Sequence, residues 1–274
     1  MSLKFTILGC GSSGGVPRIG NNWGACDPEE PRNRRLRCSL LIEREADAGT
    51  TRVLIDTSPD LREQLLVSGV GALDGVLYTH EHADHTHGID ELRVVAINMR
   101  RRVAAFADAA TADMLRTRFG YCFEAPPGSE YPPIVTLGRL VAGQPIVIDG
   151  KGGPIEAVPF SVLHGNMAVL GFRIGNVAYT PDISGMNDDS HRWLADLDLW
   201  IVDALRDTPH PSHFTVAEAL AWIERLGPRR AILTNMHVDL DYATLRRTLP
   251  AGVEPAYDGL SMKSAAFADD ADIP

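Results

Sequence analysis

Residues 80–85 read His-Glu-His-Ala-Asp-His and place four potential metal ligands within one short segment. They directly follow residues 75–79, a short apolar run that predicts a buried strand. On extended backbone the first two histidines point to the same side and can bind one ion. The aspartate and the last histidine, where the chain turns into a helix, can face a second ion. Imidazole nitrogen and carboxylate oxygen are ligands of zinc and also suit manganese or iron, whereas an exposed polar loop would not explain this spacing.

Strand and helix patterns alternate along the rest of the chain. Short β-branched or aromatic runs predict strands at residues 4–8, 40–44, 52–55, 155–163, 169–179, 197–202 and 230–234. The run 169–179 folds back at Gly175-Asn176, a dipeptide that favours a tight hairpin. Helical spacing covers residues 61–66, 92–99, 112–119, 215–226 and 242–249, and Thr215 with Glu218 forms a capping box. This order predicts an α/β fold in which two mixed β sheets with helices outside form a four-layer αββα sandwich.

Three segments lack regular patterns, at residues 12–37, 124–133 and 263–274. Long loops inside a compact domain are usually functional or disordered, so we expect the first two to form the rim of the site. No low-complexity linker divides the chain. We therefore expect one domain over residues 1–262 and a flexible acidic tail over residues 263–274.

Composition excludes several classes of protein. The chain has 274 residues, of which 45% are hydrophobic, and a formal net charge of -10, which argues against stable binding of duplex nucleic acid. Its 4 cysteines are far apart and never form a C-x-x-C pair, so no disulfide framework is expected and a reducing cytoplasm fits best. The first residues are not apolar enough for a signal peptide, and no run of 18 apolar residues occurs. We expect a soluble, cytoplasmic protein without a membrane partner.

The pattern H-x-H-x-D-H after a strand resembles the signature of the metallo-β-lactamase superfamily, and the resemblance extends over most of the chain. It implies three further ligands in a fixed order, each close to the end of a predicted strand. The implied set is His80, His82, Asp84, His85, His164, Asp182 and His237. Close relatives usually carry a histidine directly after the position of Thr234, where this chain has Asn235, so the last ligand is displaced by two positions.

Such a ligand set implies two divalent ions, zinc or manganese with iron possible, about 3.5 to 4 Å apart. Asp182 and a hydroxide would bridge them, and Asp84 would both bind the second ion and orient that hydroxide. Redox diiron members of the superfamily carry a glutamate at the position of His82, so the set favours hydrolysis.

Three further segments, residues 9–17, 31–39 and 210–215, resemble the phosphodiesterases that open cyclic phosphoribose phosphates and the related tRNA 3′-processing endonucleases. In those enzymes a histidine before the helix that precedes the last ligand acts as general acid, and His213 matches it by position. The resemblance implies a hydrolase that cleaves a cyclic or small nucleotide-like phosphodiester. The cysteine-rich zinc loop of the cyclic phosphodiesterases is reduced to Cys26, so no structural zinc is expected.

Alternative interpretations stay open. A tRNA 3′-processing endonuclease is disfavoured by the acidic balance, and a non-catalytic accessory protein of cofactor biosynthesis is disfavoured by the complete ligand set. The cluster Arg32, Arg34, Arg35 and Arg37 is either a phosphate clamp or a solvated face. Residues 9–14 fit the dinucleotide-binding pattern G-x-G-x-x-G, but no helical pattern follows them. Family likeness also allows a homodimer contact through residues 121–134.

Overall fold

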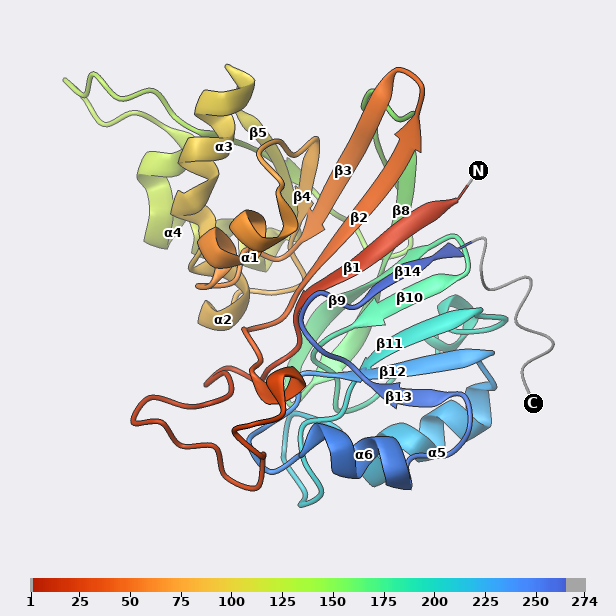
Figure 1. Cartoon of the computed structure of the whole chain (residues 1–274). Coiled ribbons are helices and arrows are strands. Elements are labelled where there is room, and N and C mark those ends of the chain that lie inside the picture. Colours follow the sequence, from red (N-terminus) through yellow and green to blue (C-terminus); the bar gives the residue numbers. More distant parts are fainter. Residues whose placement is uncertain (1, 265–274) are drawn as a thin grey trace.

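The structure is a computed structural model that describes residues 2–264. It contains two sheets of seven strands each, with helices on their outer sides (Figure 1). The first sheet consists of β1 (Leu3–Gly9), β2 (Ser39–Ala46), β3 (Gly49–Ile55), β4 (Gly75–Leu77), β5 (Val103–Ala107), β6 (Val135–Arg139) and β14 (Ser261–Lys263). The second consists of β7 (Ile146–Ile148), β8 (Ile155–His164), β9 (Met167–Ile174), β10 (Val177–Thr180), β11 (Leu199–Asp203), β12 (Arg230–Thr234) and β13 (Val253–Pro255).

Both sheets are mixed. The strand orders are β14-β1-β2-β3-β4-β5-β6 and β13-β12-β11-β10-β9-β8-β7. In the first sheet β14, β1, β2 and β3 pair antiparallel, and β3 to β6 are parallel. In the second, β7 to β10 are antiparallel and β10 to β13 are parallel. Each sheet therefore has a parallel half, and the carboxyl ends of those strands are the usual place for a ligand site in α/β folds.

The longer helices lie on opposite outer sides of the two sheets (Figure 1). On the first sheet are α1 (Leu61–Ser68), α3 (Leu92–Met99) and α4 (Ala109–Phe123), and on the second are α5 (Val216–Leu226) and α6 (Tyr242–Thr248). The short α2 (Ala83–Thr86) follows β4. Three single-turn 3-10 helices, η1 (Pro31–Asn33), η2 (Ile89–Glu91) and η3 (His191–Trp193), complete the described elements. This arrangement confirms the predicted four-layer sandwich.

Alternation along the strands builds the core. In β1, Phe5 and Ile7 are buried and belong to the same apolar cluster as Phe160 and Phe172 of the second sheet. A second cluster packs the other side of the first sheet against its helices. Burial of these side chains is the main favourable term in folding. Trp200 of β11 is fully buried, and its Nε1 donates to Thr180 Oγ1 at 2.9 Å, so its polar atom is satisfied.

The predicted turn and the predicted capping box are confirmed. Gly175 has a φ of 58° in the turn between β9 and β10, a left-handed conformation that glycine adopts without strain. Thr215 and Glu218 form the capping box that begins α5, and Gly227, with a φ of 61°, ends it. The described cysteines form no disulfide. Within residues 2–264 no helix is both long and apolar enough to cross a membrane.

Other expectations need correction. The strands β5, β6, β7, β13 and β14 were not predicted, because they are short and lack a clear alternation. Lys263, which was assigned to the tail, pairs with Lys4 in β14. The rest of the predicted tail, residues 265–274, lies outside the described residues. Residues 12–37 contain only η1 and isolated bridges, as expected of a long loop.

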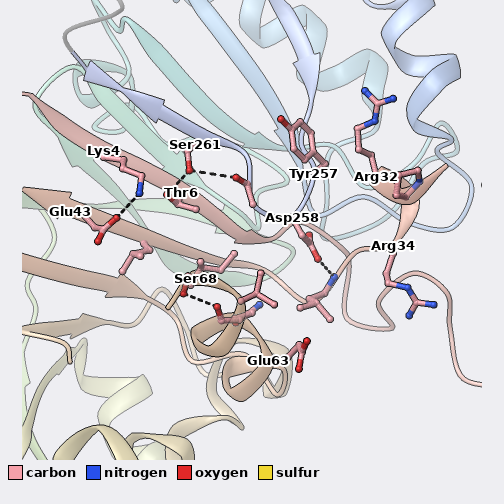
Figure 2. A pocket seen from close by; sticks show the side chains of 17 residues that line it. Lys4, Thr6, Arg32, Arg34, Glu43, Glu63, Ser68, Tyr257, Asp258 and Ser261 are labelled. Carbon is pink, nitrogen blue, oxygen red and sulfur yellow. Dashed lines mark hydrogen bonds and ion pairs between the residues drawn. The ribbon is translucent and has the colours of Figure 1, made fainter. Parts of the chain in front are cut away.

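The outer side of the first sheet is hollowed at β14, β1 and β2. A cavity of about 790 Å³ lies there, between α1 and the segment that carries Arg32 and Arg34 (Figure 2). Lys4 and Glu43 line it and form an ion pair, with Nζ 2.9 Å from Oε2. None of the predicted metal ligands lines this cavity.

Candidate metal centre

The predicted ligands meet at the ends of strands from both sheets. His80 and His82 follow β4 of the first sheet, and α2 begins at Ala83 and brings Asp84 and His85 around the turn. From the second sheet come His164, the last residue of β8, and Asp182, which lies two residues beyond β10. Six of the predicted ligands are brought together in this way: His80, His82, Asp84, His85, His164 and Asp182. The sandwich therefore assembles ligands that are up to 102 positions apart in the sequence.

His80, His82, His164 and Asp182 form the tighter group. Each offers one ligand atom, and these atoms all lie within 4.8 Å of one another. Nδ1 of His82 is 3.3 Å from Nε2 of His164. Two nitrogens bound to one tetrahedral zinc at about 2.0 to 2.1 Å are separated by about 3.3 Å, so this spacing suits a shared ion. Oδ2 of Asp182 lies 3.5 Å from Nε2 of His164 and 3.6 Å from Nε2 of His80.

The other carboxylate oxygen of Asp182 faces a second group. Its Oδ1 is 3.2 Å from Nε2 of His85, and that nitrogen is 3.5 Å from Oδ2 of Asp84. Asp182 thus stands between two sets of ligand atoms and presents one oxygen to each.

Second partners orient the imidazoles so that a nitrogen faces the centre. The hydroxyl of Thr79 donates to Oδ2 of Asp56 at 2.8 Å, so its oxygen accepts Nδ1–H of His80 at 2.9 Å. Nδ1–H of His85 donates to the same Asp56 oxygen at 2.8 Å. Nδ1–H of His164 donates to the carbonyl of Ser212 at 2.6 Å. Such partners fix the tautomer of a metal-binding histidine and raise its basicity.

Two of the imidazole nitrogens that face the centre make no hydrogen bond with the described part of the chain. Nε2 of His80 and Nε2 of His85 are buried without a hydrogen-bond partner among the described residues. A buried polar atom that is left unsatisfied costs about 1 to 3 kcal/mol, and a divalent cation bound at each nitrogen would remove that cost. The residues present therefore fit a metal centre.

The charges of the centre are unequal. Burial lowers the pKa of His80 well below its ordinary value, and the neighbouring His85 lowers it further. Burial would raise the pKa of Asp182, but His85, His80 and His213 together outweigh burial and hold that pKa well below its ordinary value. Asp182 is therefore an ionised carboxylate surrounded by imidazoles, which is the state that a metal ligand requires.

His213 lies beside this group and pairs with Asp203, the last residue of β11. Its Nδ1 is 2.7 Å from Oδ2 of Asp203, and its ring centroid is 4.6 Å from that of His164. Burial opposes the charged form of His213, but the hydrogen bond and the charge of Asp203 raise its pKa to about 9. An imidazolium held in this way can donate a proton.

The centre opens into a cavity of about 270 Å³ whose lining includes His82, Asp84, His164, Asp182 and His213. Ser12, Arg18 and Arg206 line the same cavity.

His237, the last predicted ligand, lines this cavity but has other contacts in the structure. Its Nε2 contacts a terminal nitrogen of Arg18, and its Nδ1 lies 2.8 Å from Oδ2 of Asp239. It is not one of the four residues of the tighter group. A guanidinium cation therefore stands at the nitrogen where the prediction places an ion.

The arginine cluster of residues 32–37 does not line the cavity at the centre. Arg32 pairs with Glu30 at 2.7 Å. Arg35 is buried and donates to the carbonyl of Leu240 at 2.7 Å. Arg37 pairs with Asp60 at 2.9 Å. In the structure these three arginines contact other parts of the protein and do not face the predicted ligands.

Sequence reasoning missed three polar residues next to the ligands: Asp56, Asp203 and Asn235. Each stands at or directly after the end of a buried strand, β3, β11 or β12. That position was the only signal in the sequence, since ligand sites of α/β folds lie outside the carboxyl ends of strands.

Comparison with known proteins identifies the family. A family model described as the Beta-lactamase superfamily domain matches residues 51–236. The chain belongs to the β-lactamase superfamily. A solved structure described as a new diphosphatase from the PhnP family has the same fold as this chain, with a TM-score of 0.85. The two are 35% identical, and the match covers 96% of this chain and 97% of that one. The resemblance inferred from the sequence is thereby confirmed.

Two further relatives are similar to this chain in sequence. An octanoyltransferase of Porphyromonas gingivalis is 34% identical over 263 residues, which are 94% of this superfamily chain but 51% of that protein. This chain thus spans about half the length of that relative. A ribonuclease Z of Bradyrhizobium diazoefficiens is 27% identical over 271 residues, covering 75% of this chain and 85% of that protein.

Proposed function

We propose that this protein is a binuclear metal-dependent hydrolase of small phosphodiesters. The observation that carries the proposal is the position of the Asp182 carboxylate between two groups of ligand atoms. Its Oδ2 faces His164 and His80, and its Oδ1 faces His85. One ion would be held by His80, His82, His164 and Asp182. The second would be held by Asp84, His85 and Asp182. Zinc and manganese both suit these ligands, and iron is compatible with them.

His237 remains our proposed last ligand of the second ion. It lines the same cavity as Asp84 and Asp182. Its Nε2 would exchange the guanidinium of Arg18 for the ion, so one cation would replace another at that nitrogen.

When bound, the two ions would acidify a water and offset the negative charge of the phosphate. The side chains supply the remaining steps. Asp84 would orient the attacking water from the side of the second group. His213, held by Asp203 at 2.7 Å, would give its proton to the oxygen of the leaving alcohol. A charged donor is useful here because an alkoxide is a poor leaving group.

The cavity supports an anionic substrate of small size. Among residues 2–264, no carboxylate lies within ion-pair distance of Arg18 or Arg206, and both line the cavity. Ser12 also lines it, and its buried Oγ has no hydrogen-bond partner among the described residues. Arg206 already donates to the carbonyls of Thr208 and Pro209, so phosphate oxygens would add the anionic partner that both arginines lack within the described chain and would accept from Ser12. A volume of about 270 Å³ favours a cyclic or small nucleotide-like ester over a folded RNA.

The relatives support phosphate chemistry to different degrees. The 35% identical structure is described as a diphosphatase, and a more distant relative is a ribonuclease Z. A tRNA 3′-processing endonuclease therefore stays the second candidate. A non-catalytic accessory protein is disfavoured, since the tighter ligand group is complete. We further propose a cytoplasmic protein, in keeping with four free cysteines.

The first test is elemental analysis together with hydrolysis of bis(p-nitrophenyl) phosphate, before and after chelation and after zinc or manganese is restored. We expect two ions per chain and activity that is lost with a chelator and recovered with metal. His82→Ala should abolish the activity, and His191→Ala, a change outside the centre, should not. Two ions without cleavage of any diester would reject the phosphodiesterase, and fewer than two would reject the binuclear centre.

A further inference from the structure

Asn235 links the metal ligands to the proposed acid. It directly follows β12 and is 2% exposed. Its Nδ2 lies 3.2 Å from Oδ1 of Asp182 and 3.2 Å from Oδ1 of Asp203. A primary amide carries two N–H groups, so one amide can donate to both carboxylates at once.

We infer that Asn235 is a positioning residue that fixes Asp182 and the Asp203–His213 pair in one arrangement by donating a hydrogen bond to each carboxylate. The inference rests on the proposed function, in which Asp182 is a ligand and His213 is the acid. Asn235 also lines the cavity, but the role inferred for it is to hold two side chains and not to bind substrate or ion. It acts through the two aspartates.

The third neighbour of the amide does not compete. Nδ1 of His213 is also 3.2 Å from Nδ2 of Asn235. That ring nitrogen already gives its proton to Oδ2 of Asp203 at 2.7 Å, so it cannot accept another. Both amide protons are therefore available to the carboxylates.

A neutral donor is the side chain that these surroundings require. Asp182 and Asp203 are both buried, with 3% and 0% exposure. A carboxylate at position 235 would add a third acceptor and a further negative charge. An amide satisfies one oxygen of each aspartate and adds no charge.

The backbone holds the amide in place. Asn235 has a φ of 59°, a left-handed conformation that asparagine tolerates better than most residues. On one side the carbonyl of Thr234 accepts the N–H of Ala204 at 3.0 Å, and on the other the N–H of Met236 donates to the carbonyl of Cys10 at 2.8 Å. The amide therefore projects from a rigid segment between the two sheets' ends.

Loss of the amide would free Asp203 at one oxygen. Oδ2 of Asp203 would keep its hydrogen bonds from the N–H of Ile183 at 3.1 Å and from His213, but Oδ1 would lose the donor that Asn235 supplies. A carboxylate held at one oxygen can pivot and move the imidazole with it. A displacement of about 1 Å in a catalytic group can cost about a hundredfold in rate.

The test compares Asn235→Gly and Asn235→Asp with wild type. Glycine accepts a positive φ, so the first variant removes the amide without backbone strain, and the second keeps the shape but replaces the donor with an acceptor. Asn21→Gly is the matched control, because Asn21 has a φ of 58° but is exposed and outside the centre. Two diesters are compared: bis(p-nitrophenyl) phosphate, with a good leaving group, and adenosine 2′,3′-cyclic phosphate, with an alkoxide leaving group.

We expect Asn235→Gly to keep two ions and to lower kcat/KM for the cyclic phosphate by about tenfold to a hundredfold, with a much smaller loss for the nitrophenyl ester. Combined with His213→Ala, it should add little further loss, because both changes act on the same step. Equal losses for both esters with two ions retained would overturn the inference, and so would full additivity with His213→Ala.

A measurement without turnover separates this inference from the proposed function. The Nδ1 proton of His213 should give a low-field NMR signal that is absent in His213→Ala. In Asn235→Gly it should shift or broaden, while Asn21→Gly leaves it unchanged. If wild type cleaves neither ester, the proposed function fails and this signal alone decides the positioning role. An unchanged signal in Asn235→Gly would reject it.

Discussion

Nδ1 of His85 lies 2.8 Å from Oδ2 of Asp56, and both side chains have 0% exposure. The same oxygen accepts the hydroxyl of Thr79, and the other accepts the backbone N–H of Thr79 at 2.8 Å. One buried carboxylate thus orients the histidine of the second ligand group directly, and the first histidine of the motif through Thr79.

Asp56→Asn is therefore expected to weaken metal binding by about tenfold to a hundredfold, as loss of an outer partner of a ligating histidine commonly does. Asparagine tolerates the positive φ of 64° at this position, so the fold should be kept. Competition with a chromophoric chelator measures the affinity. Asp47→Asn, in an exposed turn, serves as control. Unchanged affinity in Asp56→Asn would show that the partner of His85 does not matter for the ion.

His213→Ala should slow cleavage of an alkoxide ester far more than cleavage of a nitrophenolate ester. A general acid contributes about a hundredfold to ten-thousandfold where the leaving group needs a proton, and little where it does not. The kcat/KM values for adenosine 2′,3′-cyclic phosphate and bis(p-nitrophenyl) phosphate give the comparison. His210→Ala, a change at a histidine of the same cavity, should not reproduce the difference between the two esters. Equal losses in His213→Ala would contradict the acid role.

His237→Ala should retain the ion of the tighter group and lose much of the second one. The reason is that His237 is the proposed third side chain for that ion besides the bridging Asp182, and the alanine offers no nitrogen. Elemental analysis after dialysis against a limited metal concentration gives the stoichiometry. If both ions remain, His237 is not a ligand, and its contacts with Arg18 and Asp239 describe its role.

Asp258 should make the stability depend on pH. Burial raises its pKa to about 7 despite hydrogen bonds from the N–H groups of Leu36 and Cys10. The folded state then binds more protons than the unfolded state between about pH 4 and 7. The contribution of Asp258 to the free energy of unfolding is therefore greatest at low pH and falls as the pH rises through this range, by at most about 1.4 kcal/mol per unit.

Asp258→Asn removes that titration. Urea unfolding of the metal-free protein at several pH values should show that wild type loses stability relative to the variant as the pH rises. The constant offset between the two proteins is not the readout, since the new amide changes the hydrogen bonds as well. A difference that does not vary with pH would show that Asp258 titrates normally.

The sequence predicted the parts of the fold that have strong periodic signals. The strand before His80, the hairpin at Gly175 and the capping box at Thr215 each combine a pattern with a local physical cause, and all were confirmed. Strands β13 and β14 are as short as β4, with three residues each, but Val-Glu-Pro and Ser-Met-Lys lack the apolar run by which β4 was predicted. Whether such a segment becomes a strand depends on the strand that it pairs with, and that neighbour cannot be identified from the local sequence.

The site was predicted in the same uneven way. The dense motif of residues 80–85 indicates metal binding by itself, but Asp203 and Asn235 are single polar residues whose importance depends on which strand ends meet. The structure brings them to Asp182 and His213 across the second sheet. Such a meeting is a property of the tertiary fold, and no local pattern encodes it.

The origin of the ligands has a consequence for how the protein gains and loses its structure. His80 and His82 come from the amino-terminal half of the sandwich, while His164 and Asp182 come from the other half. An ion shared by all four would act as a reversible cross-link between halves that are distant in the chain. Since an ion that binds only the folded state adds stability with the logarithm of its concentration, the cohesion of the two halves would follow the metal supply of the cell.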